Sequence, residues 1–190
     1  MDTQVVIKKF PEWLPIIRSA RSVIPSTTWP YWHKYSDENS TKYATKDPSR
    51  LSESCKLLLQ LICLNVAAPD ESFPDFDLHG AGLHWIPEGG HLSHHRDGEI
   101  HPLTGWNRKA SSILFLSDCL GGDLVVDGYE PIRPEPGKLV TFESNLGHKV
   151  NQVIRGDRYT LSLFWWSLNG DGVTEKATFT QEIDDGSCAH

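Results

Sequence analysis

The chain has 190 residues and a formal net charge of −7, which suits one domain with a sizeable core and makes non-specific nucleic-acid binding a poor expectation. The four cysteines form no C-x-x-C pair, which argues against a zinc finger or a dense disulfide framework and favours a reducing compartment, the cytoplasm: Cys55, Cys63, Cys119 and Cys188. The first residues, MDTQVVIKKF, lack the apolar run of a signal peptide, and no stretch approaches the roughly eighteen apolar residues of a membrane span.

Two helices are predicted in the first third of the chain. Residues 10–24, FPEWLPIIRSARSVI, have apolar residues at helical spacing and end before a proline. Residues 49–65, SRLSESCKLLLQLICLN, carry one apolar face and two capping candidates, Ser49 and Ser52, so this helix should pack across a sheet. Between them, residues 25–48 are polar with interspersed aromatic side chains. This pattern favours a surface loop whose rings cover the core, and a mobile substrate lid is the alternative.

After Pro69 the pattern changes to short β-like runs separated by glycine and proline turns. The runs are LHGAGLHWI, ASSILFLS, GDLVVDG, KLVTFES, HKVNQVI and RYTLSLFWW. Helices followed by strands predict an α+β fold, with the strands forming a sandwich, barrel or jelly roll. We expect one domain over residues 1–190, divided into a helical support region (1–69), a strand-rich catalytic core (70–168) and a polar, acidic tail (169–190).

The stretch HLSHHRDGEI, residues 91–100, concentrates three histidines and two carboxylates. It does not form the helical H-E-x-x-H site of a zinc protease, because two glycines precede it and Leu-Ser stands where the glutamate is needed. In an extended segment, alternate residues share a face, so His95 and Asp97 would point the same way. His148, between two predicted strands, is well placed as a third ligand. Two histidines and one carboxylate with open positions are typical of non-haem Fe(II) oxygenases, although His95 can also be a surface histidine beside a carboxylate.

Arg158 opens the apolar run RYTLSLFWW, ten residues after His148. Its guanidinium should therefore lie at the rim of an apolar interior, where it needs an anionic partner. A guanidinium binds a carboxylate through two parallel hydrogen bonds, and Thr160 shares the same strand face and can donate its hydroxyl to the same anion. The partner is either a bound carboxylate or an internal Asp or Glu, and the residues alone leave both readings open.

Residues 82–166 resemble the catalytic core of the Fe(II)/2-oxoglutarate-dependent dioxygenases, in particular the prolyl 4-hydroxylase-like branch. The matching pieces, in chain order, are PEGGHLSHHRD, RKASSILFLSDCLGGDLVV, PEPGKLVTFES and GHKVNQVIRGDRYTLSLFWW. The joint match is far more specific than any one motif. The resemblance implies a double-stranded β-helix, a jelly-roll or cupin-like core with the N-terminal helices packed on one sheet.

The resemblance also implies roles for individual residues. His95, Asp97 and His148 match the Fe(II) ligands. Arg158 matches the basic residue that pairs with the distal carboxylate of 2-oxoglutarate, with Thr160 as its helper.

Other residues near these motifs have less definite roles. Relatives often carry a tyrosine near Ile86 that helps to hold 2-oxoglutarate, and its absence here leaves one cosubstrate contact unassigned. His91 and His94 fall outside the ligand set, since His94 alternates to the other strand face and His91 is solvated or lies at the rim. Three tryptophans either line the pocket or, as is commoner for such rings, pack in the core: Trp106, Trp165 and Trp166.

The activity implied is an Fe(II)- and 2-oxoglutarate-dependent dioxygenase that uses O2, hydroxylates a C–H bond and converts 2-oxoglutarate to succinate, with ascorbate as a further candidate cofactor. The substrate is a prolyl residue in a protein or peptide, or alternatively a free amino acid or other small molecule. A third hypothesis, from a different class, is a cupin-like module whose histidines hold zinc or no metal. Arg158 at its spacing argues against that module, which needs no cosubstrate anchor. We expect neither nucleic acid nor a membrane as a partner, and the oligomeric state is left open.

Overall fold

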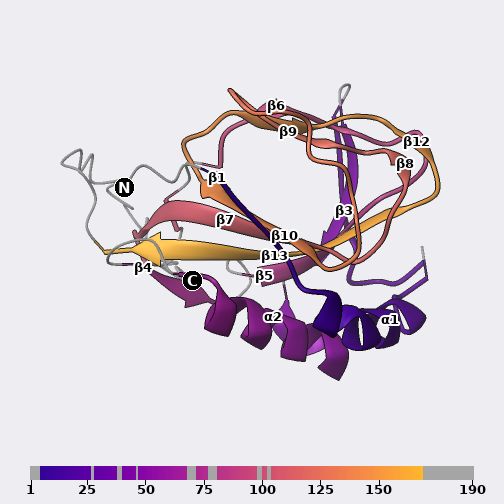
Figure 1. Cartoon of the computed structure of the whole chain (residues 1–190), viewed down its shortest axis with the longest axis horizontal. Helices are drawn as coiled ribbons and strands as arrows, with labels where there is room; N and C mark the ends of the chain where they lie inside the picture. Colours follow the sequence, from indigo (N-terminus) through magenta and orange to yellow (C-terminus); the bar gives the residue numbers. More distant parts are fainter. Residues whose placement is uncertain are drawn as a thin grey trace, which may run out of the picture.

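The computed structural model describes residues 5–26, 28–37, 40–45, 47–67, 72–76, 81–97, 100–101 and 104–168. The tail expected over residues 169–190 lies outside this part of the chain. The described residues form a double-stranded β-helix in which two sheets face each other and two helices cover the outer face of the larger sheet (Figure 1). None of the helices in these ranges is both long and apolar enough to cross a membrane.

The larger sheet holds most of the described strands. They are β1 (Val5–Lys9), β2 (His33–Asp37), β3 (Ser40–Thr45), β4 (Ser72–Asp75), β5 (Ala81–Ile86), β7 (Asn107–Phe115), β10 (Lys138–Glu143) and β13 (Arg158–Ser167). Their order is β1-β10-β7-β13-β5-β3-β2, with β4 pairing beside β13, and the pairs are antiparallel. The central strand, β13, is buried along almost its whole length because β5, β4 and β7 flank it.

The smaller sheet lies opposite and carries both predicted histidine ligands, His95 on one strand and His148 on another. It contains β6 (Leu92–His95), β11 (His148–Val150) and β9 (Leu124–Val126) in the order β6-β11-β9, and a separate pair, β8 (Leu120–Gly121) with β12 (Val153–Arg155), continues beside it. Apolar side chains fill the space between the sheets: Ile86, Phe115, Leu124, Val126, Ile132, Val140, Phe142, Val150 and Val153. Each of the six predicted β-like runs overlaps a strand of one of these sheets.

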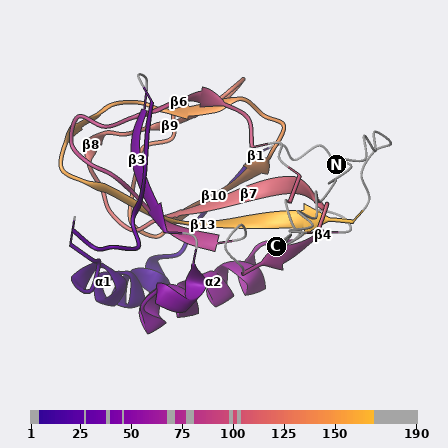
Figure 2. The same cartoon turned by 180° about the vertical axis from the view of Figure 1, so that it is seen from behind.

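Both predicted helices are confirmed, with shifted beginnings. A 3-10 turn, η1 (Pro11–Trp13), leads into α1 (Leu14–Ser22), and a second turn, η2 (Pro48–Arg50), precedes α2 (Glu53–Asn65). Ser52 caps α2, since its Oγ accepts a hydrogen bond from the Cys55 N–H at 3.3 Å. Ser49 lies inside η2 and is not a cap. The helices lie beneath the larger sheet, where their apolar faces form a second core with Leu83, Leu161, Leu163 and Trp165 (Figure 2).

The expectation for residues 25–48 was wrong in part. Instead of a loop or a lid, the described part contains a hairpin, β2 and β3, that extends the sheet beyond β5. The region 1–69, expected to be helical support, also supplies the edge strand β1. The hairpin strands were not predicted because their mostly polar sequences, HKYSD and STKYAT, lack an apolar alternation of period two. The aromatic residues do cover the core, as expected: Tyr43 stacks on Trp85 with ring centroids 4.6 Å apart.

Candidate active site

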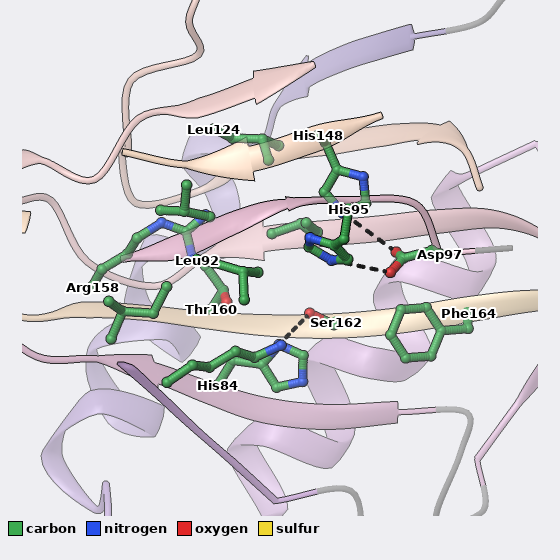
Figure 3. Close-up of a pocket in the computed structure, with 14 residues that line it drawn as sticks. His84, Leu92, His95, Asp97, Leu124, His148, Arg158, Thr160, Ser162 and Phe164 are labelled. Carbon is green, nitrogen blue, oxygen red and sulfur yellow. Dashed lines mark hydrogen bonds and ion pairs between the residues drawn. The ribbon is translucent and has the colours of Figure 1, made fainter. Parts of the chain in front are cut away.

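Neighbouring strands of the smaller sheet bring the predicted triad together. His95 on β6 pairs directly with His148 on β11, and Asp97 follows two residues after His95 (Figure 3). One side-chain atom from each of His95, Asp97 and His148 lies within 4.8 Å of the others. Asp97 lies between the rings, with Oδ1 3.5 Å from His95 Nε2 and Oδ2 3.7 Å from His148 Nε2. The backbone N–H of Asp97 also donates to the Ser144 carbonyl at 3.0 Å, which fixes the chain at this point.

The backbone orients both imidazole rings for metal binding. Nδ1 of His95 donates to the Ser93 carbonyl at 2.8 Å, and Nδ1 of His148 donates to the Leu146 carbonyl at 3.1 Å. In the neutral tautomer this leaves an Nε2 lone pair on each ring, and both lone pairs point toward the Asp97 carboxylate. Electron-rich atoms that face one another in this way require a proton or a cation between them. The donor set therefore fits a divalent metal ion with nitrogen and oxygen ligands.

The charges around Asp97 keep it ionised. Burial would raise its pKa, but the hydrogen bond with His95 and the charges of His148 and Arg108 outweigh burial and hold the pKa below its usual range. The hydrogen bond with Asp97 raises the pKa of His95, whereas burial lowers the pKa of His148. A carboxylate that stays charged beside two histidines is suited to hold a cation.

Two residues that sequence reasoning missed hold the Asp97 side chain. Ser111 Oγ donates to Asp97 Oδ2 at 2.6 Å, and Arg108 Nη1 lies 3.4 Å from Oδ1. The Arg108 guanidinium lies 3.8 Å from the ring centroid of Phe164 and 5.0 Å from that of Trp166, so it is buried between aromatic rings. Both residues belong to β7, inside the motif RKASSILFLS. Arg108 stands there between Asn107 and Lys109, so the sequence offered no signal that singled it out.

Arg158 and Thr160 line the same pocket as the triad. Along β13, Arg158, Thr160, Ser162 and Phe164 alternate on the pocket face, with Arg158 at one end and Phe164 at the other (Figure 3). The side chain of His84 lies beside them and hydrogen-bonds Ser162 at 3.0 Å.

Arg158 is buried with part of its guanidinium unsatisfied. The residue is only 3% exposed, and its Nε donates to the Gly122 carbonyl at 3.0 Å. Its Nη2 has no hydrogen-bond partner, and it forms no ion pair with any Asp or Glu, within the part of the chain that the structure describes. Burial lowers the pKa of Arg158 to about 10, which still leaves the group charged at neutral pH. A buried, charged donor aimed into a pocket is suited to an anionic ligand.

The remaining candidates lie away from the triad. His94 points to the opposite side of β6, as the alternation predicts, and its Nε2 lies 3.0 Å from each carboxylate oxygen of Asp127. His91 is half-buried and is not part of the triad. Ile86 is buried in the pocket wall, so its side chain offers no polar contact in place of the tyrosine that relatives often carry near this position. The three tryptophans are absent from the pocket lining and pack elsewhere: Trp165 in the core between the larger sheet and the helices, and Trp106 and Trp166 around His101.

Comparison with known proteins supports this arrangement. Residues 81–166 match the family model described as the 2OG-Fe(II) oxygenase superfamily. A PKHD-type hydroxylase from Pseudomonas putida is 31% identical over 131 residues, which cover 64% of this chain and 54% of the relative. The chain thus spans about half the length of the curated relatives that it matches.

Solved structures share the fold at low sequence identity. The crystal structure of a Pseudomonas putida prolyl-4-hydroxylase has a TM-score of 0.61 and 18% identity, with 86% of this chain and 92% of that chain covered. A prolyl hydroxylase from Trichoplax adhaerens, in complex with a hypoxia inducible factor peptide fragment, has a TM-score of 0.63 and 14% identity, with 87% and 84% covered. Residues 81–166 are thus similar in sequence to the 2OG-Fe(II) oxygenase superfamily, and the described residues share the fold of the prolyl hydroxylases. Within that class, the domain resembles the prolyl 4-hydroxylase-like branch, whose superfamily uses Fe(II), 2-oxoglutarate and O2.

Proposed function

We propose that the protein is an Fe(II)- and 2-oxoglutarate-dependent dioxygenase that hydroxylates a C–H bond of its substrate. The observation that carries the proposal is the combination, in one pocket, of a convergent His-Asp-His triad and a buried guanidinium with an unsatisfied nitrogen. His95, Asp97 and His148 are the proposed Fe(II) ligands. Arg158, helped by Thr160, is the proposed anchor for the distal carboxylate of 2-oxoglutarate.

Different residues of the pocket have different proposed roles. Bound Fe(II) supplies the oxidising chemistry, in which O2 and 2-oxoglutarate yield succinate, CO2 and a hydroxylated product. Arg158 and Thr160 orient one end of the cosubstrate by charge and hydrogen bonding. Apolar side chains of the pocket wall exclude water and strengthen these polar contacts: Ile86, Leu92, Ile113, Leu124 and Val150.

For the substrate, we propose a prolyl residue in a protein or peptide. The support is indirect: relatives named PKHD-type hydroxylases, and a similar fold in prolyl hydroxylases, one of them in complex with a peptide. A free amino acid or other small molecule is the alternative on the same scaffold. A cupin-like module without catalysis is disfavoured, because metal binding alone gives no reason to bury the Arg158 charge.

The organisation and compartment of the chain stay as proposals. We propose that residues 1–190 are one catalytic domain, supported by the strands β1 to β3, which join the N-terminal third to the main sheet. A reducing compartment such as the cytoplasm is supported by the free thiols of Cys55, Cys63 and Cys119.

The test is succinate release from 2-oxoglutarate by the purified protein with Fe(II), with and without proline-rich peptides and with and without ascorbate. We expect slow release alone and faster release with a peptide that is a substrate. Asp97→Asn should abolish release, while Asp127→Asn, which alters a carboxylate on the outer side of β6, should leave it intact. Manganese-loaded protein that binds no 2-oxoglutarate would contradict the assignment.

A further inference from the structure

The β2–β3 hairpin places a lysine in the lining of the candidate active-site pocket. Lys42 on β3 is half-buried and lines the pocket together with His95, His148 and Arg158. Lys42 was not among the candidate site residues predicted from the sequence, because residues 25–48 were expected to form a loop. Its place follows from the pairing of β3 with β5, which brings the hairpin beside the pocket.

An aromatic stack determines which face of β3 Lys42 occupies. Tyr43, Trp85 and Tyr159 are paired across β3, β5 and β13, and their rings stack with centroids 4.6 Å and 6.2 Å apart. Since successive side chains of a strand point to opposite faces, the neighbours of these rings point into the barrel. Lys42 is one such neighbour.

The same register brings Lys42 level with the anchor end of the pocket. Ile86 pairs with Arg158, one step beyond the Trp85–Tyr159 pair, and Lys42 is one step beyond Tyr43 in the same direction. Lys42 therefore lies in the cross-strand row of Ile86 and Arg158, two strand spacings or about 10 Å from Arg158 between backbones. A lysine side chain can span much of that separation.

We propose that Lys42 binds a carboxylate of 2-oxoglutarate and so supplies the contact that Ile86 cannot make. This inference rests on the proposed function. Two cations on adjacent parts of one wall, Arg158 and Lys42, match a ligand that carries two carboxylates. The hairpin is then part of the cosubstrate site as well as of the sheet.

The experiment measures 2-oxoglutarate affinity by calorimetry on Mn(II)-loaded protein, where no turnover occurs. Lys42→Met keeps most of the side-chain length but removes the charge, and it should raise the Kd by roughly tenfold to a hundredfold. Lys42→Arg should recover much of the affinity. The matched control is Lys34→Met: Lys34 is exposed on the same hairpin and pairs with Tyr43, on the outer face, so its loss should change nothing.

Mn(II) affinity separates a binding role from a structural one. Removing a positive charge near the triad should leave Mn(II) binding unchanged or slightly tighter, whereas a damaged fold would weaken it. Titration with 2-oxopentanoate, which has the same carbon chain but no distal carboxylate, identifies the carboxylate that Lys42 contacts. If Lys42→Met weakens 2-oxoglutarate but not 2-oxopentanoate, the contact is distal; if it weakens both, the contact is at the keto-acid end.

The outcomes distinguish a failure of the Lys42 assignment from a failure of the proposed function on which it rests. Wild-type protein that binds Mn(II) but not 2-oxoglutarate would overturn the proposed function and the Lys42 assignment together. Wild-type protein that binds 2-oxoglutarate, with unchanged affinity in Lys42→Met, would overturn the Lys42 assignment alone. In that case, loss of turnover in the variant would place Lys42 on the side of the primary substrate.

Discussion

The two faces of β13 show how one strand serves stability and chemistry at once. Toward the helices it presents Tyr159, Leu161, Leu163 and Trp165, which pack into the core between the larger sheet and the helices. Toward the pocket, the alternate residues are Arg158, Thr160, Ser162 and Phe164. Both faces are buried, yet the first is apolar and the second is mostly polar.

The two faces of β13 contribute differently to the stability of the fold. Burying an aliphatic side chain stabilises the fold by roughly 1.5–3 kcal/mol, whereas a buried cation without a partner costs free energy. The β13 side chains that point toward the helices therefore stabilise the fold. The pocket face retains the buried charge of Arg158, whose Nη2 has no hydrogen-bond partner among the described residues. Variants on the two faces should accordingly change different measured quantities.

The largest effect is expected at the metal triad, opposite the pocket face of β13. His148→Ala should remove most of the bound Mn(II) or Co(II), because it deletes one of the three proposed protein ligands. Metal content per protein after desalting is the measurement. The control is His94→Ala, on the outer side of β6, which should bind metal normally. Loss of metal in the His94 variant together with retention in the His148 variant would reverse the assignment.

Arg158 should behave as a ligand anchor. Truncating one partner of a buried charged contact costs roughly 2–5 kcal/mol, so Arg158→Ala should raise the Kd for 2-oxoglutarate by at least about thirtyfold. Metal content and the Tm of the apo protein should change little, since the variant removes a buried charge that lacks a full set of partners. Arg158→Lys should be milder, because it keeps the charge but loses the planar fork.

The opposite result would assign Arg158 to the fold. Unchanged 2-oxoglutarate affinity together with a collapsed Tm would show that its charge is needed for folding and would move the non-catalytic binding module ahead. Affinity and thermal unfolding measured on the same variants separate these readings.

Leu163 tests the other face of the same strand. Leu163 is fully buried, and Leu→Ala at such a site costs about 2–5 kcal/mol through lost burial and the cavity left behind. Denaturant unfolding should show this loss, while folded Leu163→Ala protein should bind metal and 2-oxoglutarate with near wild-type affinity. A large change in ligand affinity with unchanged stability would break the division between the two faces.

The smallest effect is expected for Arg108 on β7, which contacts the proposed metal ligand Asp97. Arg108→Met should weaken Mn(II) binding roughly tenfold to a hundredfold, because Arg108 orients the Asp97 carboxylate without touching the metal. Arg108→Lys should restore part of the affinity if orientation by a charge is the cause. Lys109→Met, on the next residue of β7, is the control. Equal loss in the lysine and methionine variants, with a matching fall in Tm, would indicate packing between Phe164 and Trp166 instead.

Local patterns were sufficient to predict both helices, most of the strands and the triad. The helical period of 3.6 and the strand period of two are carried by neighbouring residues, so the sequence shows them directly. The same alternation placed His95 and Asp97 on one face and His94 on the other. The order of four motifs then predicted a double-stranded β-helix and the third ligand, His148.

Tertiary structure decided what depends on contacts between distant residues. The β2–β3 hairpin exists because β5 offers it a partner edge, and its polar strands carry no period that predicts it. Arg108 reaches Asp97 from another sheet, and Lys42 enters the pocket only through the register of β3 against β5. Whether Arg158 had an internal acidic partner was likewise a question of packing, because a buried charge is satisfied by whichever residues the fold brings near it, at any separation along the chain.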